Sequence, residues 1–361
     1  MKTRSILEHL EPYVPGKRIP GGIKLSSNEN PHGPSPRALD AIAAVATDIH
    51  RYPDGGMHLL REAIARRWNV SADMVVVGNG SDEILVMIAG ALLDSGTNVV
   101  TGQHTFSQYT FAAQIFGAEV RTVSMPDGSF DLSGILAQID DQTRIVFLCS
   151  PNNPTGTIIG TVALERFLAD VSPDVLVVVD EAYGEYVESR NYPDTIGLVR
   201  EHPNLIRLRT FSKIYGLAAL RVGYGIAQPQ LIEAIGKLRQ PFNVGTIAQA
   251  AAAAALEDSE FVSRSLETNR EGKARLYSFL DETGIEYYAT EANFVCARMD
   301  GVVPGGTRQV IEALREQRIA IRPLRSFGLP EYARISIGLP EEMDALYEAL
   351  SRTMNGAAAG G

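Results

Sequence analysis

The sequence contains little of what marks disulfide-rich, metal-binding or membrane-spanning proteins. It has two cysteines and one tryptophan in 361 residues. The cysteines, Cys149 and Cys296, lie in separate apolar runs typical of buried strands, so we expect neither a disulfide nor a metal ligand there. Zinc-binding spacings such as C-x-x-C and H-E-x-x-H are missing, so no metal site is predicted. No run approaches the roughly 18 consecutive apolar residues of a membrane span.

An excess of positive charge is also missing. Lys and Arg number 33 against 43 Asp and Glu, which gives a net charge of -10. Proteins that bind nucleic acid carry basic patches, so nucleic acid is not an expected partner. The N-terminal stretch MKTRSILEHLEPYVPGK lacks the apolar segment of a secretory signal. We therefore expect a cytoplasmic protein with reduced thiols and no membrane partner.

Strand-like and helix-like runs alternate between residues 74 and 226. The strand-like runs lie at 74–78, 98–101, 119–123, 144–149, 175–180, 205–210 and 222–226. This alternation predicts an α/β fold, with a large domain whose mainly parallel seven-stranded sheet is flanked by helices. After residue 284 the strand-like runs are short and surround one helix at 307–317, which predicts a smaller α+β domain.

The composition divides the chain into four parts. Residues 1–37 are rich in proline and glycine and are expected to form an N-terminal arm that packs with the small domain. Residues 38–258 form the large domain and residues 259–354 the small C-terminal domain. A long helical region that begins near Pro229 and breaks near Pro241 bridges the two. The tail at 355–361, NGAAAGG, is predicted to be disordered.

Polar groups gather at the ends of the predicted strands, where open α/β sheets bind their ligands. The run LIRLRTFSKIYGLAALRVGYG at 205–225 presents Lys213 directly after a strand. In an apolar neighbourhood this amine loses its proton more readily and attacks carbonyl carbons. Ser212 and Arg221 nearby are good phosphate partners. An amine that forms a Schiff base beside phosphate-binding groups suits pyridoxal 5'-phosphate; the alternative is a surface lysine.

Asp180 ends a strand made of valines and one leucine. A carboxylate there is poorly solvated and needs a cationic partner, such as the protonated pyridine nitrogen of the same cofactor. Tyr183, three residues further on, is placed to reach the oxygen on the cofactor's ring. The alternative is a buried aspartate with a structural role.

The segment GNGSDE at 78–83 follows the first strand and opens a helix. Free backbone N–H groups at such a helix start, approached closely at Gly80 and joined by the hydroxyl of Ser81, make an anion site. The alternative is a plain turn in which Ser81 or Asp82 caps the helix. The third glycine of the dinucleotide fingerprint is missing, which disfavours a dinucleotide site.

Three further residues have both a functional and a structural interpretation. Phe106 either stacks on the cofactor ring or belongs to the core. Asn153, within SPNNPTG at 150–156, either donates to the ring's phenolate oxygen or forms part of a proline-rich turn. Tyr52, in the turn RYPDGG, is either a loop anchor or a functional hydroxyl.

Taken together, these motifs resemble the aspartate-aminotransferase-like (fold type I) pyridoxal-phosphate enzymes and, among them, the histidinol-phosphate aminotransferases. The resemblance spans nearly the whole chain in order. It is carried by LSSNENP at 25–31, RYPD at 51–54, GNGSDE at 78–83, TFSQY at 105–109, SPNNPTG at 150–156, DEAY at 180–183, TFSK at 210–213, GLAALRVGY at 216–224 and RISIG at 334–338.

The resemblance implies roles for the cofactor-binding residues. Lys213 bonds to the cofactor's aldehyde carbon and then moves a proton, while Asp180 pairs with the ring nitrogen and Tyr183 with the phenolate oxygen. The remaining implied cofactor contacts are Asn153 at the phenolate oxygen, Phe106 on the ring, and Gly80, Ser81, Asp82, Ser212 and Arg221 around the phosphate.

The resemblance also implies how substrates bind and how chains assemble. Arg334 binds the substrate's anionic group with the help of Arg322, and Asn28 lies on an arm that closes over the substrate. Tyr52 reaches the phosphate of the neighbouring subunit's cofactor, so a homodimer with shared sites is expected.

The implied reaction is a transamination of L-histidinol phosphate with 2-oxoglutarate. Two alternatives share the motifs: an aromatic-amino-acid aminotransferase and a decarboxylase of the threonine-phosphate type. His104 and Ala219 stand where many relatives have proline and glycine, so the motifs leave the amino donor open. A regulator with an added DNA-binding domain is disfavoured, because only about 37 loop-like residues precede the body.

Overall fold

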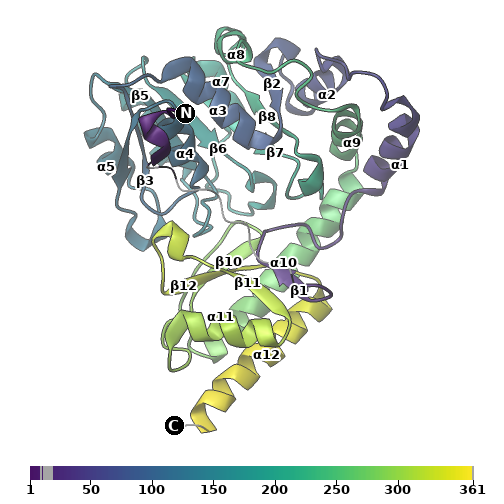
Figure 1. The fold of residues 1–361 in the computed structure, drawn as a ribbon, viewed down its shortest axis with the longest axis vertical. Helices are drawn as coiled ribbons and strands as arrows, with labels where there is room; N and C mark the ends of the chain where they lie inside the picture. Colours follow the sequence, from purple (N-terminus) through teal and green to yellow (C-terminus); the bar gives the residue numbers. More distant parts are fainter. Residues whose placement is uncertain (9, 11–18, 360–361) are drawn as a thin grey trace.

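The computed structural model describes residues 1–8, 10 and 19–359. Figure 1 shows a broad upper part built on a seven-stranded sheet and a narrower lower part built on a five-stranded sheet. The long helix α10 (Ser259–Glu282) runs from the upper part into the lower one. This arrangement confirms the predicted α/β class with a second, smaller sheet.

The large sheet has the strand order β2-β8-β7-β6-β5-β3-β4. Only β8 runs antiparallel to its neighbours, so the sheet is mainly parallel, as predicted. Its strands are β2 (Val75–Gly78), β3 (Asn98–Gly102), β4 (Glu119–Val123), β5 (Thr143–Cys149), β6 (Leu176–Asp180), β7 (Leu205–Thr210) and β8 (Gly223–Ile226).

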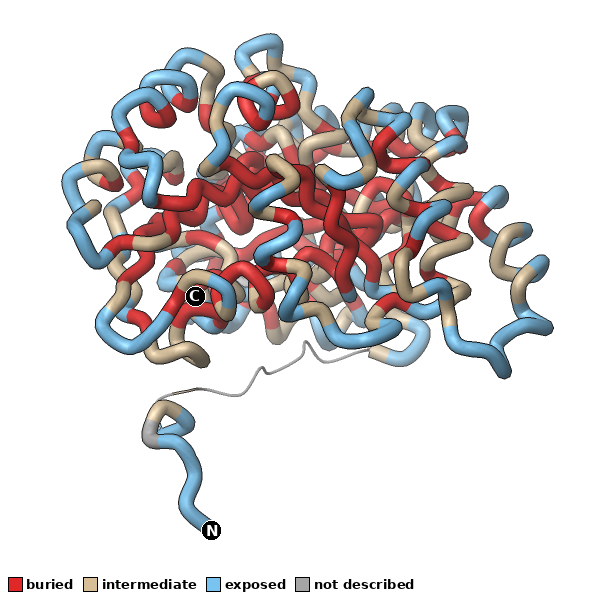
Figure 2. The backbone as a smooth tube through the Cα atoms, turned by 90° about the horizontal axis from the view of Figure 1, so that it is seen from above, coloured by how far each residue is buried: buried red, intermediate tan, exposed pale blue. Residues whose placement is uncertain are grey.

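Helices cover both faces of this sheet, because successive side chains of its strands point to opposite faces. In β6, Val177 and Val179 join one apolar cluster while Leu176 and Val178 join the other. Figure 2 shows buried backbone running through the middle of the molecule, with more exposed segments around it. The covering helices are α1 (Pro36–Val45), α2 (His58–Trp68), α3 (Gly80–Leu92), α4 (Gln108–Ile115), α5 (Leu132–Ala137), α6 (Thr161–Asp170), α7 (Thr195–Glu201), α8 (Pro229–Gly236) and α9 (Thr246–Leu256).

The small sheet has the order β1-β11-β12-β10-β9. Its edge strand comes from the N-terminal arm, where Ile23 pairs in parallel with Ile319 of β11. Helices α10, α11 (Gly306–Glu316) and α12 (Pro340–Ala359) accompany it. Its strands are β1 (Ile23–Leu25), β9 (Tyr287–Tyr288), β10 (Phe294–Arg298), β11 (Ile319–Pro323) and β12 (Tyr332–Ser336).

Short 3-10 turns connect several of these elements. They are η1 (Ser5–Glu8), η2 (Ala46–Asp48), η3 (Ala72–Met74), η4 (Pro126–Gly128), η5 (Gly184–Tyr186), η6 (Ala218–Leu220) and η7 (Arg325–Phe327). In residues 1–8, 10 and 19–359, no helix is both long enough and apolar enough to cross a membrane.

The C-terminal end differs from the expectation. Residues 355–359, predicted to be disordered, continue helix α12, whose alanines favour helix; residues 360–361 of the predicted tail lie outside the described residues. The predicted long helical region is three helices rather than two, because the chain breaks a second time at Asp258, whose side chain accepts from the N–H of Phe261 and caps α10. Residues 9 and 11–18 of the predicted arm lie outside the described residues.

Candidate active site

The polar residues predicted at strand ends meet where the two sheets face each other. Asp180 ends β6, Lys213 follows β7 and Asn153 follows β5. Arg334 on β12 of the small sheet donates to the Oδ1 of Asn153, which joins the two halves of the site. The site therefore lies at the carboxyl ends of the parallel strands, as the fold dictates.

Lys213 is half-buried and lies above the ring of Tyr183, with its Nζ 5.6 Å from the ring centroid. The Nζ donates to the carbonyl oxygen of Ser27 at 3.2 Å. Burial, helped by the nearby charge of Arg334, lowers the pKa of Lys213 to about 8. The amine is therefore neutral far more often at pH 7 than an exposed lysine, as a nucleophile for carbonyl carbons requires.

Asp180 is 2% exposed, and its Oδ1 accepts from the N–H of Ala182 at 3.1 Å. Burial raises its pKa to about 6. Among the described residues it has no ion pair with a cation, although buried carboxylates normally have one. A ligand with a protonated ring nitrogen would supply that cation, so the residue fits the pyridine end of pyridoxal phosphate.

Tyr109, which the sequence did not single out, is the second neighbour of this carboxylate. Its hydroxyl donates to the Oδ2 of Asp180 at 2.8 Å. Its ring lies edge-on to Phe106, with centroids 5.7 Å apart and an interplanar angle of 83°. Phe106 itself is half-buried, so part of its ring remains available to another planar group.

The start of α3 forms a cradle with the segment after Lys213. Gly80 has φ +72°, and a Cβ there would come within 2.7 Å of the Nη2 of Arg221. The Nη1 of Arg221 donates to the Oγ of Ser212 at 3.3 Å, and its Nη2 donates to Asp82 at 3.0 Å. Ser81 is buried beside them. Free N–H groups at the helix start, the hydroxyls and the guanidinium together fit a phosphate.

The arm lies against the lysine segment and the small sheet at once. The Nδ2 of Asn28 donates to the hydroxyl of Tyr183 at 2.9 Å, and the N–H of Asn28 donates to the Oγ of Ser336 at 2.8 Å. The Nδ2 of Asn30 donates to the carbonyl of Ile214 at 2.7 Å. These bonds close the site on the side of the arm.

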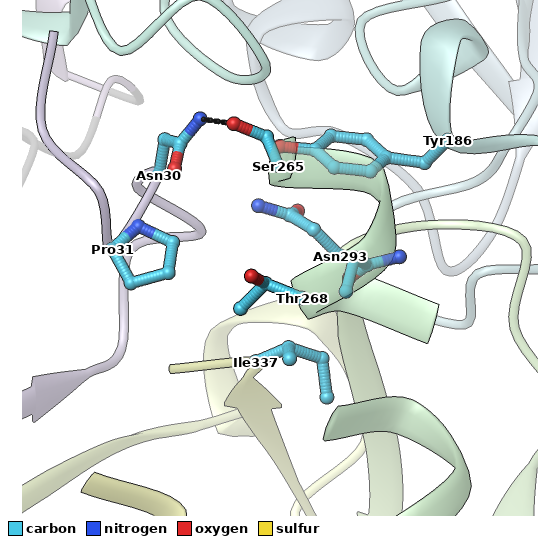
Figure 3. A pocket seen from close by; sticks show the side chains of 8 residues that line it. Asn30, Pro31, Tyr186, Ser265, Thr268, Asn293 and Ile337 are labelled. Carbon is cyan, nitrogen blue, oxygen red and sulfur yellow. Dashed lines mark hydrogen bonds between the residues drawn. The ribbon is translucent and has the colours of Figure 1, made fainter. Parts of the chain in front are cut away.

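A small polar cavity lies behind the arm, as Figure 3 shows. Its volume of about 10 Å³ suits one water molecule and no substrate. Asn269 and Asn293 each have a buried side-chain oxygen without a hydrogen-bond partner among the described residues. The cavity therefore lies at the contact between the arm and the rest of the chain and is not a substrate site. It is lined by Asn30, Pro31, Tyr186, Ser265, Thr268, Asn269, Asn293 and Ile337.

Two arginines lie side by side on the small sheet. Arg334 is buried, with its guanidinium 5.3 Å from the centroid of the Phe294 ring, and its Nη2 donates to the carbonyl of Ser26 at 3.1 Å. Arg322 is half-buried and stands directly opposite Arg334 in the register of β11 and β12. Paired residues of adjacent strands share a face, so two like charges meet there, which favours binding of an anion.

Comparison with known proteins places this geometry in a family. The chain matches the family of class I and II aminotransferases over residues 20–350. It belongs to that family. It is 46% identical over 356 residues to the histidinol-phosphate aminotransferase of Brevibacillus brevis, covering 96% of each chain. It is 45% identical to the enzyme of that name from Geobacillus thermodenitrificans, covering 98% of each.

Solved structures of aminotransferases have the same fold. The histidinol-phosphate aminotransferase of Sinorhizobium meliloti, in complex with pyridoxal-5'-phosphate, aligns with a TM-score of 0.89 at 29% identity and covers 98% of each chain. The aspartate aminotransferase of Thermus thermophilus with maleate aligns with a TM-score of 0.85 at 21% identity, covering 98% of this chain and 100% of the other. The second likeness concerns the fold alone.

Tyr52 lies apart from the other predicted site residues of this aminotransferase chain. Its side chain is 83% exposed and stacks on Phe242, with ring centroids 4.7 Å apart. Within the described residues it makes no hydrogen bond with the groups above. The implied contact with a neighbouring subunit stays a prediction.

A second carboxylate follows Asp180 directly and points to different neighbours. Glu181 is fully buried; its Oε2 accepts from the Nε of Arg207 at 2.5 Å and from Arg209 at 3.0 Å. Burial alone would raise the pKa of Glu181, but the two arginines hold it below its usual value. Thr195 donates to its other oxygen at 2.9 Å. Glu181 is thus a fully paired structural acid.

Proposed function

We propose that the protein is a pyridoxal-phosphate-dependent aminotransferase that converts L-histidinol phosphate and 2-oxoglutarate into imidazole-acetol phosphate and glutamate, in histidine biosynthesis. Relatives named histidinol-phosphate aminotransferase, 42–46% identical over nearly the whole chain, support the reaction. The observation that carries the proposal is that one site contains two unusual groups. Asp180 is buried and has no ion pair among the described residues, and Lys213 is half-buried and has a lowered pKa.

The residues of the site suit the parts of this cofactor. Asp180 would hold the ring nitrogen, Phe106 would lie against the ring, and Gly80, Ser81, Ser212 and Arg221 would hold the phosphate. Asn153 would donate from its Nδ2 to the ring's oxygen, because Arg334 donates to its Oδ1. When bound, pyridoxal phosphate supplies an electron sink for charge that develops at the substrate carbon.

The chain's own groups bind the substrates and move the proton. Lys213 is the base that would take the proton from the substrate carbon and deliver it to the C4' carbon of the cofactor, since its amine is neutral often enough near pH 7. Arg334 and Arg322 bind the substrate's anion. Both substrates carry one, a phosphate or a carboxylate, so a single arginine pair serves both half-reactions. Asn28 closes the arm over the bound substrate.

We further propose a cytoplasmic homodimer that shares its sites. The side chains of Asp82 and Arg221 at the phosphate cradle are 41% and 47% exposed in the single chain. The exposed pair Tyr52 and Phe242 offers apolar surface that a second copy would cover. Sedimentation should show a dimer, and Phe242→Ser should weaken it. The division into an arm at 1–37, a large domain at 38–258 and a small domain at 259–354 belongs to the same proposal.

The reaction is tested by the colour of the bound cofactor. L-histidinol phosphate should bleach the near-visible absorbance of the holoenzyme at lower concentration than phenylalanine, and 2-oxoglutarate should restore it. A stronger response to phenylalanine would indicate an aromatic-amino-acid aminotransferase, and carbon dioxide release from threonine phosphate would indicate the decarboxylase.

Lys213→Ala should abolish both the near-visible absorbance and transamination, because no other amine can bond to the cofactor there. Lys273→Ala is the matched control, since Lys273 is also largely buried but pairs with Glu188 at 3.3 Å. Retained transamination in Lys213→Ala would contradict the assignment.

A further inference from the structure

The carboxylate at the end of β6 is held by two donors of different kinds. The Oδ1 of Asp180 accepts from the backbone N–H of Ala182, and the Oδ2 accepts from the hydroxyl of Tyr109. Tyr109 is 0% exposed. Among the described residues, Tyr109 is the one side chain that hydrogen-bonds to Asp180, and its hydroxyl can be removed without changing the backbone.

Two aromatic neighbours and a backbone hydrogen bond hold the tyrosine in place. Its ring stacks on Phe147 with centroids 5.0 Å apart and an interplanar angle of 6°. Phe106 lies edge-on against it, and the N–H of Tyr109 donates to the carbonyl of Phe106 at 3.3 Å. A side chain locked in this way presents its hydroxyl at a fixed point. Tyr109 thus touches both the residue that would hold the ring nitrogen and the residue that would lie against the ring.

The groups around Asp180 otherwise favour its protonated form. Cys149 of β5 stands opposite Asp180 in register, Asp82 of α3 lies within range of its charge, and Glu181 follows it in the chain. Burial is the largest cause of the raised pKa and the two acids add to it, while the hydrogen bonds from Tyr109 and, to a smaller extent, from the N–H of Ala182 act against it. The hydroxyl stays a donor, because burial and Asp180 raise the pKa of Tyr109 well above its usual value.

We propose that Tyr109 is a positioning residue that keeps Asp180 ionised and aimed at the ring nitrogen of the cofactor. The inference rests on the proposed function. Without the hydroxyl, Asp180 would take up a proton more readily and lose one of its two anchors. A neutral carboxyl no longer favours a protonated ring nitrogen, so the site would bind the cofactor more weakly and draw off less charge in the reaction.

Tyr109→Phe tests this because it removes one oxygen and keeps the ring. Tyr224→Phe is the matched control: Tyr224 is equally buried, and its hydroxyl accepts from the Nε1 of Trp68 at 2.8 Å. The first readout is the titration of Asp180 in the cofactor-free full-length chain, followed by carboxyl-labelled NMR and assigned with Asp180→Asn. We expect the midpoint to rise by about one unit in Tyr109→Phe and to stay at the wild-type value in Tyr224→Phe.

The second readout is the loaded enzyme. In Tyr109→Phe, kcat should fall about tenfold to a hundredfold with KM for the amino donor within about threefold, and the cofactor's Kd should rise. In the Asp180→Asn background, adding Tyr109→Phe should cost little more, because the tyrosine acts through the aspartate. Additive losses would overturn the inference.

The outcomes separate the two claims. An unchanged Asp180 midpoint in a folded Tyr109→Phe chain would overturn this inference alone. Failure of the wild-type chain to bind pyridoxal phosphate would overturn the proposed function and this inference with it. If Tyr109→Phe does not fold, the wild-type chain provides the test. The NMR resonance of the Tyr109 hydroxyl proton should change with pH at the titration midpoint of Asp180. A resonance that does not change at that pH would overturn the inference.

Discussion

Asp180 and Glu181 are consecutive buried acids with opposite surroundings. Glu181 has two arginines and a threonine, and its pKa is lowered. Asp180 has only neutral donors, and its pKa is raised to about 6. Because successive residues at a strand end point to opposite faces, one side of the sheet receives a fully paired acid and the other an acid that still needs a cation. Burial alone does not distinguish a structural carboxylate from a functional one; its partners do.

The strongest test of this contrast replaces Asp180. Asp180→Ala should retain phosphate anchoring but reduce kcat by about a thousandfold or more, because the ring nitrogen loses its counter-charge. Steady-state kinetics with L-histidinol phosphate measure the effect. A loss below about tenfold would mean that Asp180, like Glu181, has a structural role.

The neighbouring substitution should act on stability instead. Glu181→Gln leaves Arg207 and Arg209 buried without their counter-charge, and removal of one partner from a buried ion pair costs about 3–5 kcal/mol. Urea unfolding measures the free energy, with Asp180→Asn as the matched control one residue away. Equal stability of the two amide variants would remove the distinction between the acids.

The pH dependence of stability sharpens the same contrast. An aspartate titrates near pH 3.9 in the unfolded chain and Asp180 at about 6 in the folded one, so the folded state binds its proton more tightly. Asp180 thus destabilises the cofactor-free chain above pH 6 by about 3 kcal/mol, and this cost disappears as the pH falls to about 4. Asp180→Asn should be more stable than wild type at pH 7 and equal to it near pH 4. Thermal unfolding at several pH values measures the difference in stability between Asp180→Asn and wild type. A difference that does not change with pH would contradict this expectation.

The smallest effect is expected at an exposed pair. Lys24 and Glu29 are 2.7 Å apart with side chains 44% and 43% exposed. Solvent screens such pairs, so Lys24→Ala should change the free energy of unfolding by less than about 1 kcal/mol. A larger loss of unfolding free energy in urea would show that burial does not explain the cost of breaking the ion pairs of Glu181 with Arg207 and Arg209.

The sequence predicted the elements that carry strong local patterns. All seven strands of the large sheet were predicted, and the clearest, β2 and β6, are buried on both faces and are runs of valine and leucine. Asp180 was singled out because it ends such a run, and Lys213 because it comes three residues after the end of a strand. Strand β1 and helix α12 were not predicted: three residues carry no measurable period, and the end of α12 consists of small residues that also suit a disordered tail.

Side-chain direction was beyond the sequence. Tyr109 lies inside the motif TFSQY, but only the rotation of α4 shows that its hydroxyl points to Asp180. Glu181 lies inside DEAY beside Asp180 with the same chemistry, and only the packing of Arg207 and Arg209 shows which acid is paired. Asn30 was named only as a turn former, although its amide holds the segment that follows Lys213.

The pairing of β1 with β11 sets an order of events in the cell. A ribosome releases Ile23–Leu25 early and Ile319–Pro323 late, so the arm has no strand partner while most of the chain is being made. Until then the carbonyl of Ser27 has no fixed place beside the amine of Lys213. Nascent chains that stop short of residue 319 therefore hold the lysine without the backbone that shields it, and this side of the site forms only after β11 has been made.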